Sequence, residues 1–187
     1  MPCFPGMLQA PVKGFLRPGV WMPCARDFHQ HVESWKIDGD PTHCLEEILI
    51  ATENLNEVEH PTEFYVNKVR YDDSWVQIFC YTPAGWLDVM EIDLCKYGEN
   101  MSLAKVVSFS TGLLPAWLPF GFLCDMALCW CPFRDNGSNE MRCQSLREVL
   151  PFNVQVLDNR EDERLLPKAT NQRGRSSKYR EETRKNK

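Results

Sequence analysis

The sequence predicts an α+β fold, with an antiparallel sheet of four to five strands packed with two or three helices, one of them strongly apolar. Two observations support this class. A segment with helical periodicity is followed by segments in which β-branched and aromatic residues cluster between turn residues. An almost wholly apolar run over 113–133 then precedes a second helical pattern. A chain of 187 residues with 43% hydrophobic and 25% charged residues fits one globular domain.

The first helix is predicted over about 41–54. Asp40 can accept hydrogen bonds from the free N–H groups of a first helical turn, and Pro41 fits the first helical position. Apolar residues then follow at helical spacing, which predicts one buried face. Residues 1–39 show little periodicity and are predicted to form an irregular, proline-rich arm, with prolines at positions 2, 5, 11, 18 and 23.

Four strands are predicted next, at about 63–71, 75–81, 86–94 and 102–110. Each is joined to the next by a short segment rich in turn residues, which suits antiparallel pairing. The expected arrangement is a twisted antiparallel meander packed against the first helix.

The chain after the apolar run contains the last predicted elements. Ser138 or Asn139 can cap a second helix, Pro151 helps to end it, and residues 152–157 alternate like a final strand. We therefore predict a single domain over 40–159 that carries the run 113–133 as an insert. Residues 160–187 are predicted to be a disordered charged tail.

Charge and cysteine content limit the classes of function. The net charge of −5 combines a tail with ten basic and five acidic residues and a body with eleven basic and twenty-one acidic residues. An acidic body argues against nucleic acid as a partner, since nucleic-acid-binding domains present a basic face. Nine cysteines at irregular spacing, without an apolar leader, indicate reduced thiols and a cytoplasmic protein.

The centre of the chain resembles a domain-of-unknown-function family of bacteria and plastids. The matching segments are 85–92, 107–112 and 135–139, which read GWLDVMEI, VSFSTG and DNGSN. They are similar to a strand with an aromatic residue, two aspartates and a glutamate, then a strand Arg-Ser-x-Ser-Arg-x-Gly, and then a turn Asp-x-Gly-x-Asn before a helix. The chain has Val89 in place of the second aspartate, and Val107 and Thr111 in place of the arginines. The resemblance implies a fold and a polar corner, and no reaction.

The catalytic candidates are four polar residues of the central strands. Asp88 shares a strand face with apolar neighbours, where a carboxylate can take part in proton chemistry or can accept hydrogen bonds from backbone N–H groups of a turn. The second, structural role is the preferred interpretation. Glu91 lies three residues further along the strand and is expected on the opposite face. An enzyme would combine Asp88 with Ser108 or Ser110.

Metal and cofactor sites are not predicted. Cys124, Cys129 and Cys131 form a C-x4-C-x-C pattern, which lacks the paired C-x2-C spacing of structural zinc sites. These three thiols are instead candidates for acylation if the run 113–133 lies at a membrane. No phosphate-binding glycine loop is found in the sequence.

The run 113–133 can be buried against the sheet, interfacial or membrane-inserted. It has twenty-one residues, enough to span a bilayer, but Pro115, Pro119 and Asp125 interrupt it. The twelve residues between Pro119 and Pro132 suit a buried or an interfacial helix. A helix that is apolar on all sides must be covered by protein, by lipid or by a partner. For this helix, burial against the sheet is the preferred interpretation.

The sequence therefore predicts a non-catalytic binding module. Its apolar segment is expected to contact a membrane surface, a hydrophobic ligand or a protein partner, and the basic tail would add attraction to anionic lipid. The alternative is a small hydrolytic or isomerising enzyme. The predicted location is the cytoplasm, with peripheral association with a membrane as the alternative. The predicted binding residues are Trp117, Phe120, Phe122 and Trp130.

Overall fold

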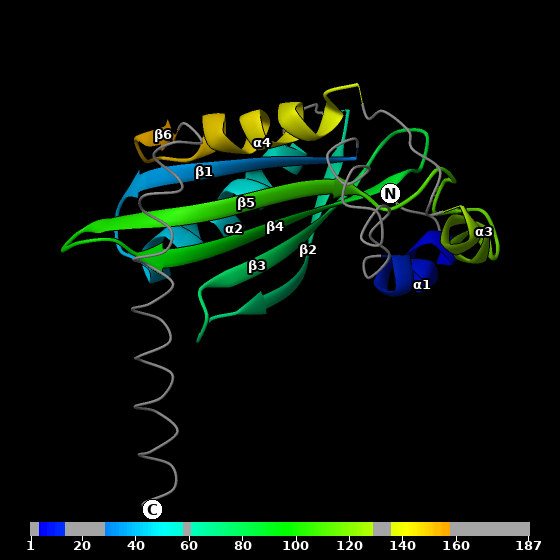
Figure 1. The fold of residues 1–187 in the computed structure, drawn as a ribbon, viewed down its shortest axis with the longest axis horizontal. Coiled ribbons are helices and arrows are strands. Elements are labelled where there is room, and N and C mark those ends of the chain that lie inside the picture. Colours follow the sequence, from blue (N-terminus) through cyan, green and yellow to red (C-terminus); the bar gives the residue numbers. More distant parts are fainter. Residues whose placement is uncertain (1–3, 14–28, 58–60, 129–135, 158–187) are drawn as a thin grey trace, which may run out of the picture.

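The computed structural model describes residues 4–13, 29–57, 61–128 and 136–157 and confirms an α+β fold (Figure 1). These residues form six strands and four helices, so the sheet is slightly wider than predicted. The tail 160–187, predicted to be disordered, lies outside the described residues. In chain order the elements are α1 Phe4–Lys13, β1 Gln30–Asp38, α2 Pro41–Glu57, β2 Glu63–Arg70, β3 Trp75–Tyr81, β4 Leu87–Lys96, β5 Met101–Ser110, α3 Gly121–Ala127, α4 Ser138–Val149 and β6 Val154–Val156.

The strands form one antiparallel sheet in the order β2-β3-β4-β5-β1-β6. β2 to β5 make the predicted meander. β1 comes first in the chain but lies between β5 and β6, with Trp35 and Ile37 fully buried. The prediction of an irregular arm over 1–39 is therefore wrong for residues 4–13 and 30–38, and the boundary at residue 40 omits a central strand.

One face of the sheet carries the main core, covered by α2 and α4 (Figure 1). Alternate residues of β4 point to this face, as predicted, because successive side chains of a strand point to opposite faces. Asp88 begins this row, which continues with Met90, Ile92 and Leu94 in the hydrophobic cluster. The cluster is closed by residues from the two helices: Cys44, Leu45, Ile48, Ala51, Leu55, Cys143, Leu146 and Leu150.

The helix beginnings differ in how well the sequence predicted them. α2 begins at Pro41, and the backbone N–H of Thr42 lies 3.4 Å from Oδ2 of Asp40, in agreement with the predicted cap. α4 begins at Ser138, but its N-cap is Gly137 in the left-handed region at φ 80°, with no side-chain cap. The predicted caps, Ser138 and Asn139, therefore lie inside the helix. The side chain of Asn139 turns toward the sheet instead.

The opposite face carries a second, smaller cluster at one end of the sheet, next to α1 and α3 (Figure 1). α1 contributes Ala10 and the segment before α3 contributes Ala116. α3 covers only the seven residues Gly121–Ala127, and most of its apolar side chains are exposed, so the preferred prediction of burial against the sheet is wrong for this helix. The strands contribute Phe79, Tyr81, Leu87, Val89 and Phe109.

Candidate functional site

The four catalytic candidates separate into a group of three and a single residue. Asp88 pairs with Ser110 across β4 and β5, and Ser108 lies two residues away on the same face. Glu91 lies on the opposite face, as predicted, and accepts a hydrogen bond of 3.0 Å from Nε2 of Gln77. The structure therefore brings Asp88, Ser108 and Ser110 together without Glu91.

α4 completes this group with two residues that sequence reasoning did not select. Nη2 of Arg142 forms an ion pair with Oδ2 of Asp88 at 2.6 Å. The amide of Asn139 accepts the hydroxyl hydrogen of Ser108 at 2.8 Å and donates to Oγ of Ser110 at 3.3 Å. All five side chains are buried. We call Asp88, Ser108, Ser110, Asn139 and Arg142 the polar anchor.

The polar anchor holds α4 against the sheet. The amide of Asn139 also donates to the backbone carbonyl of His29, at the start of β1, at 3.2 Å. Nη1 of Arg142 donates to Oδ1 of Asn139 at 3.3 Å, which links the ion pair to the hydrogen bonds. One turn of helix thus contacts β4, β5 and the residue before β1.

The chemistry of the polar anchor does not favour an enzyme. A serine nucleophile needs a base to take its proton, and the hydroxyl of Ser108 is donated to an amide oxygen. The carboxylate of Asp88 is engaged by a guanidinium, and burial keeps the group away from water. Burial also raises the pKa of the neighbouring Cys80 thiol to about 12, so this thiol is protonated at neutral pH. The ion pair gives Asp88 a structural role, with Arg142 as its partner. The hydrogen bonds from backbone N–H groups of a turn that were predicted for Asp88 stay a prediction.

A second polar group on β1 was missed because β1 itself was missed. The carboxylate of Glu33 accepts hydrogen bonds from Nε1 of Trp35 at 2.6 Å and Nη1 of Arg147 at 2.7 Å. Nε2 of His31 lies 2.9 Å from Oε1 of the same carboxylate. The alternation of residues 31, 33 and 35 in a strand was the signal that could have grouped them. Like the polar anchor, this group ties α4 to the sheet.

Metal ligands are not brought together in the part of the chain that the structure describes. No group of three or more His, Cys, Asp or Glu residues there has the spacing of a metal site. Cys124 lies exposed on α3. Cys129 and Cys131, the other acylation candidates, lie outside the described residues.

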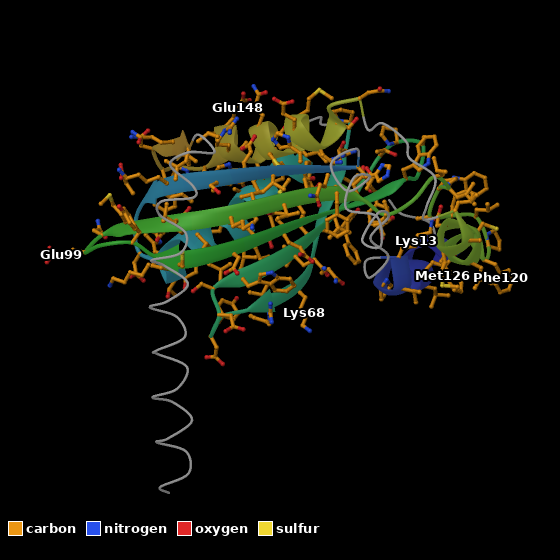
Figure 2. The ribbon with its side chains drawn as sticks, viewed as in Figure 1. Lys13, Lys68, Glu99, Phe120, Met126 and Glu148 are labelled. Carbon is orange, nitrogen blue, oxygen red and sulfur yellow. The ribbon has the colours of Figure 1, made fainter. Side chains whose placement is uncertain are left out.

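The predicted binding residues lie at the α1 and α3 end of the molecule. Trp117 and Phe120 are exposed, Phe120 by 70%, whereas Phe122 is half-buried and Trp130 lies outside the described residues. We call residues 4–13 and 113–128 the apolar tip. Figure 2 shows Phe120 and Met126 at its outer end. Its other exposed apolar side chains are Leu8, Val12, Leu123, Met126 and Leu128.

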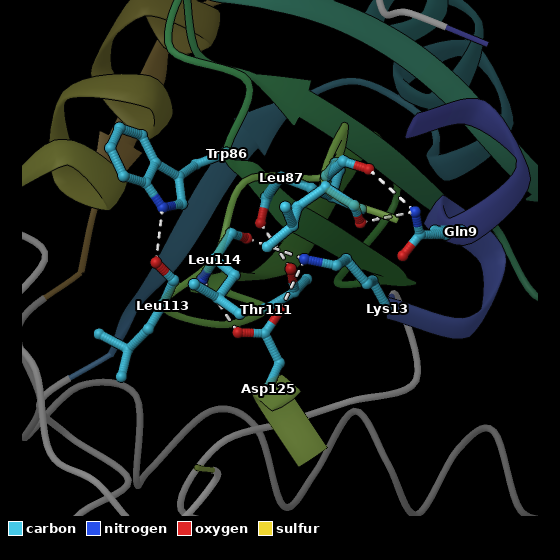
Figure 3. Close-up of polar contacts among 10 residues, drawn as sticks. Gln9, Lys13, Trp86, Leu87, Thr111, Leu113, Leu114 and Asp125 are labelled. Atoms are coloured by element: carbon cyan, nitrogen blue, oxygen red, sulfur yellow. Dashed lines mark hydrogen bonds and ion pairs between the residues drawn. The ribbon is translucent and has the colours of Figure 1, made fainter. Parts of the chain in front are cut away.

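The apolar tip contains a buried ion pair (Figure 3). Nζ of Lys13 lies 2.6 Å from Oδ2 of Asp125, and both side chains are 0% exposed. The same ammonium donates to the carbonyl oxygen of Leu114 at 2.8 Å, and the N–H of Leu114 donates to Oδ1 of Asp125 at 2.9 Å. A Cβ on Gly112 would fall on the carboxyl group of Asp125, so the absence of a side chain at residue 112 makes room for it. Asp125, the odd residue of the apolar run, is therefore neutralised from the N-terminal helix.

A turn between β3 and β4 supports the base of the apolar tip. The indole of Trp86 donates to the carbonyl oxygen of Leu113 at 2.9 Å (Figure 3), and that of Trp117 donates to the carbonyl oxygen of Ala84 at 3.3 Å. Gly85 has φ 84°, and a Cβ there would lie 2.5 Å from Cδ1 of Trp117. Both indole N–H groups are thus used internally, which leaves the rings to present apolar surface.

None of the helices in the described part of the chain is long and apolar enough to cross a membrane. Within residues 113–128 of the apolar run, the structure has one helix, α3, of seven residues. Residues 129–133 of the run lie outside the described residues.

Comparisons with known proteins do not identify a family. No protein-family model matches the sequence, and no curated protein is significantly similar to it. Two similar solved structures are Ara h 8.0201 and the protein XoxI from Bacillus cereus, each 9% identical over 65% of this chain. They are matched over 94% and 95% of their own lengths, with TM-scores of 0.38 and 0.35. The resemblance to the family of bacteria and plastids stays a prediction.

Proposed function

We propose that this protein is a non-catalytic binding module whose apolar tip docks on the surface of a lipid bilayer. The observation that carries this proposal is the pairing of Lys13 with Asp125. These are the only two charged residues in segments 4–13 and 113–128, and both are buried. The outer surface of the apolar tip therefore enters an apolar medium without desolvating a charge, which is the largest cost of such a transfer.

The shape of the apolar tip supports a lipid surface over an enclosed small ligand. Small hydrophobic ligands are bound in clefts that cover most of their surface. Phe120 and Met126 instead point outward from the end of the molecule (Figure 2) and are 70% and 53% exposed. Tryptophan rings are enriched at the boundary between headgroups and acyl chains. Trp117 and Trp86 are exposed at this end of the molecule, with their N–H groups hydrogen-bonded to backbone carbonyls.

The negative charge of the body supports a lipid surface with neutral headgroups as the binding partner. Residues 1–159 carry eleven basic and twenty-one acidic residues, so the body is repelled by anionic headgroups. The exposed part of the apolar tip is neutral, so it contributes to docking only through the burial of its apolar side chains in lipid. The basic tail 160–187 would add attraction to anionic lipid, and its effect is separable by changing the headgroup.

Flotation on lipid vesicles tests the proposal. The wild-type chain should float with neutral phosphatidylcholine vesicles, and Phe120→Ser combined with Leu123→Ser and Met126→Ser should lower the partition coefficient at least tenfold. Burying one large apolar side chain contributes about 1.5 to 3 kcal/mol, and about 1.4 kcal/mol is a factor of ten. A second set of vesicles containing phosphatidylserine measures the contribution of the tail.

The matched control removes three exposed apolar side chains from the helices on the opposite face. Ile50→Ser, Met141→Ser and Val149→Ser alter α2 and α4, and these residues are exposed to a similar degree. The control variant should float like the wild type. A wild-type chain that stays at the bottom of the gradient with both lipids, or a control that loses flotation equally, overturns the proposal.

A further inference from the structure

The apolar tip is assembled from two segments that are distant in the sequence. Lys13 and Asp125 are 112 residues apart. In α1, Ala10 and Lys13 are buried whereas Leu8 and Val12 are exposed, and in α3 Leu123 and Met126 are exposed. Figure 2 shows α1 and α3 next to each other at this end. The outer surface is therefore composite, with each helix supplying part of it.

α1 also satisfies the backbone of the segment that leads into α3. Nε2 of Gln9 donates to the carbonyl oxygens of Leu118 at 2.9 Å and Ala116 at 3.4 Å, and Nζ of Lys13 donates to that of Leu114 (Figure 3). Residues 113–120 contain no helix or strand, so donors from outside a regular ladder satisfy their carbonyl groups, and α1 supplies those for Leu114 and Ala116. Without α1, the carbonyl groups of Leu114 and Ala116 lose these side-chain donors.

Asp125 makes the position of α3 depend on α1. Its carboxylate bridges the ammonium of Lys13 and the N–H of Leu114, and it is fully buried beside Gly112. A buried carboxylate that loses its cation is strongly unfavourable and turns toward water or becomes protonated. Because α3 is one short helix, turning Asp125 outward rotates the apolar side chains of the same helix.

We infer that α1 is a latch that sets whether the apolar tip presents a lipid-binding surface. With Lys13 seated, α1 and α3 form one neutral apolar surface. With α1 unseated, Asp125 turns outward and places a negative charge among Phe120, Leu123 and Met126. Removal or capture of the N-terminal segment thus switches docking off. This inference rests on the proposed lipid docking, and the coupling of α1 to α3 is measurable without lipid.

The test combines hydrogen exchange with flotation on phosphatidylcholine vesicles, using the full chain. Lys13→Gln removes the cation, and Gly112→Ala displaces Asp125 while leaving α1 intact. Both variants should speed amide exchange of residues 121–127 at least tenfold and lower flotation at least tenfold, and Lys13→Gln should do the same to residues 4–13. The amides of α2 and α4 should keep their wild-type protection, which verifies that the body stays folded.

Two further variants separate the latch from a general loss of charge. Lys13→Met combined with Asp125→Asn removes both charges and keeps an amide oxygen for the N–H of Leu114, so it should recover protection and flotation. Lys105→Gln removes an exposed lysine of β5 and should leave both measurements unchanged.

The outcomes for the latch and for lipid docking are distinct. If Lys13→Gln leaves exchange at α3 unchanged, or speeds it without lowering flotation, the latch is overturned and lipid docking stands. If the wild type does not float, lipid docking is overturned, and the exchange measurement alone supports or overturns the coupling of α1 to α3.

Discussion

The body and the apolar tip each contain a buried ion pair of an aspartate, and the two pairs have different consequences. In the body, Asp88 of β4 pairs with Arg142 of α4 at 2.6 Å, and in the apolar tip Asp125 of α3 pairs with Lys13 of α1 at the same distance. Both pairs are buried. α4 is also held by Cys143 and Leu146 in the main core. Among the side chains of α1 that the structure describes, Ala10 belongs to the smaller cluster and Gln9 donates to two backbone carbonyls. The buried ion pair thus reinforces a helix that is anchored in the main core in one case, and joins two helices at the smaller cluster in the other.

The largest expected effect separates the two N-terminal elements. A chain of residues 29–157 loses α1 but keeps β1, and it should retain a cooperative urea transition followed by circular dichroism. A chain of residues 40–157 also loses β1, and with it Trp35 and Ile37 from the core. Removing a large buried side chain costs about 2 to 5 kcal/mol, comparable to the whole stability of a domain, so the shorter chain should not fold. Equal transitions in the two chains would contradict this assignment of β1.

The next effect compares the two aspartates directly. Asp88→Leu leaves Arg142 buried without its counter-ion and should lower the global free energy of unfolding by about 3 to 5 kcal/mol. Asp125→Leu should affect the global transition less and mainly speed amide exchange in α1 and α3, because the apolar tip can open locally. Urea titration and hydrogen exchange on both variants check this. A larger loss of global stability for Asp125→Leu would show that the apolar tip is part of the cooperative core.

The smallest effect is the difference in reactivity among the cysteines, which is measured on the wild-type chain without any substitution. Burial raises the pKa of the Cys80 thiol to about 12 and raises the pKa of the Cys143 thiol as well. Both should resist iodoacetamide at pH 8 until urea unfolds the body, since the thiolate is the reactive form. Cys124 is exposed on α3 and should react in the native protein. Mass spectrometry of the labelled peptides gives the rates. Labelling of Cys80 as fast as Cys124 would contradict the burial of the body core.

Regular elements were predictable because their signals are local. α2, the strands β2 to β5 and α4 follow from apolar spacing and turn residues, and each was expected within a few residues of its observed bounds. β1 was missed because the prolines before it made residues 1–39 appear irregular, and a strand of nine residues without proline was included with them. The period-two burial of Trp35 and Ile37 becomes visible only once β5 and β6 lie on either side.

The candidate site also contains residues that were predictable from the sequence and residues that were not. Asp88 was identified from sequence as a carboxylate on an otherwise apolar strand face, with Ser108 or Ser110 as its possible partner, and strand periodicity correctly separated Glu91 from Asp88. Their partners were not identifiable, because Asn139 was expected to cap a helix and Arg142 has no local signal that directs it inward. Packing of α4 across the sheet decided both roles.

The sequence by itself determined that one apolar run, interrupted by a single acidic residue, would need a cover or a partner. Tertiary structure alone decided how that acidic residue is tolerated, since Lys13 reaches Asp125 across 112 residues of chain. The physical reason is the distance along the chain over which each effect acts. Periodicity and turn chemistry act over a few residues, whereas the cost of a buried charge is lowered by whichever opposite charge the fold brings within about 3 Å.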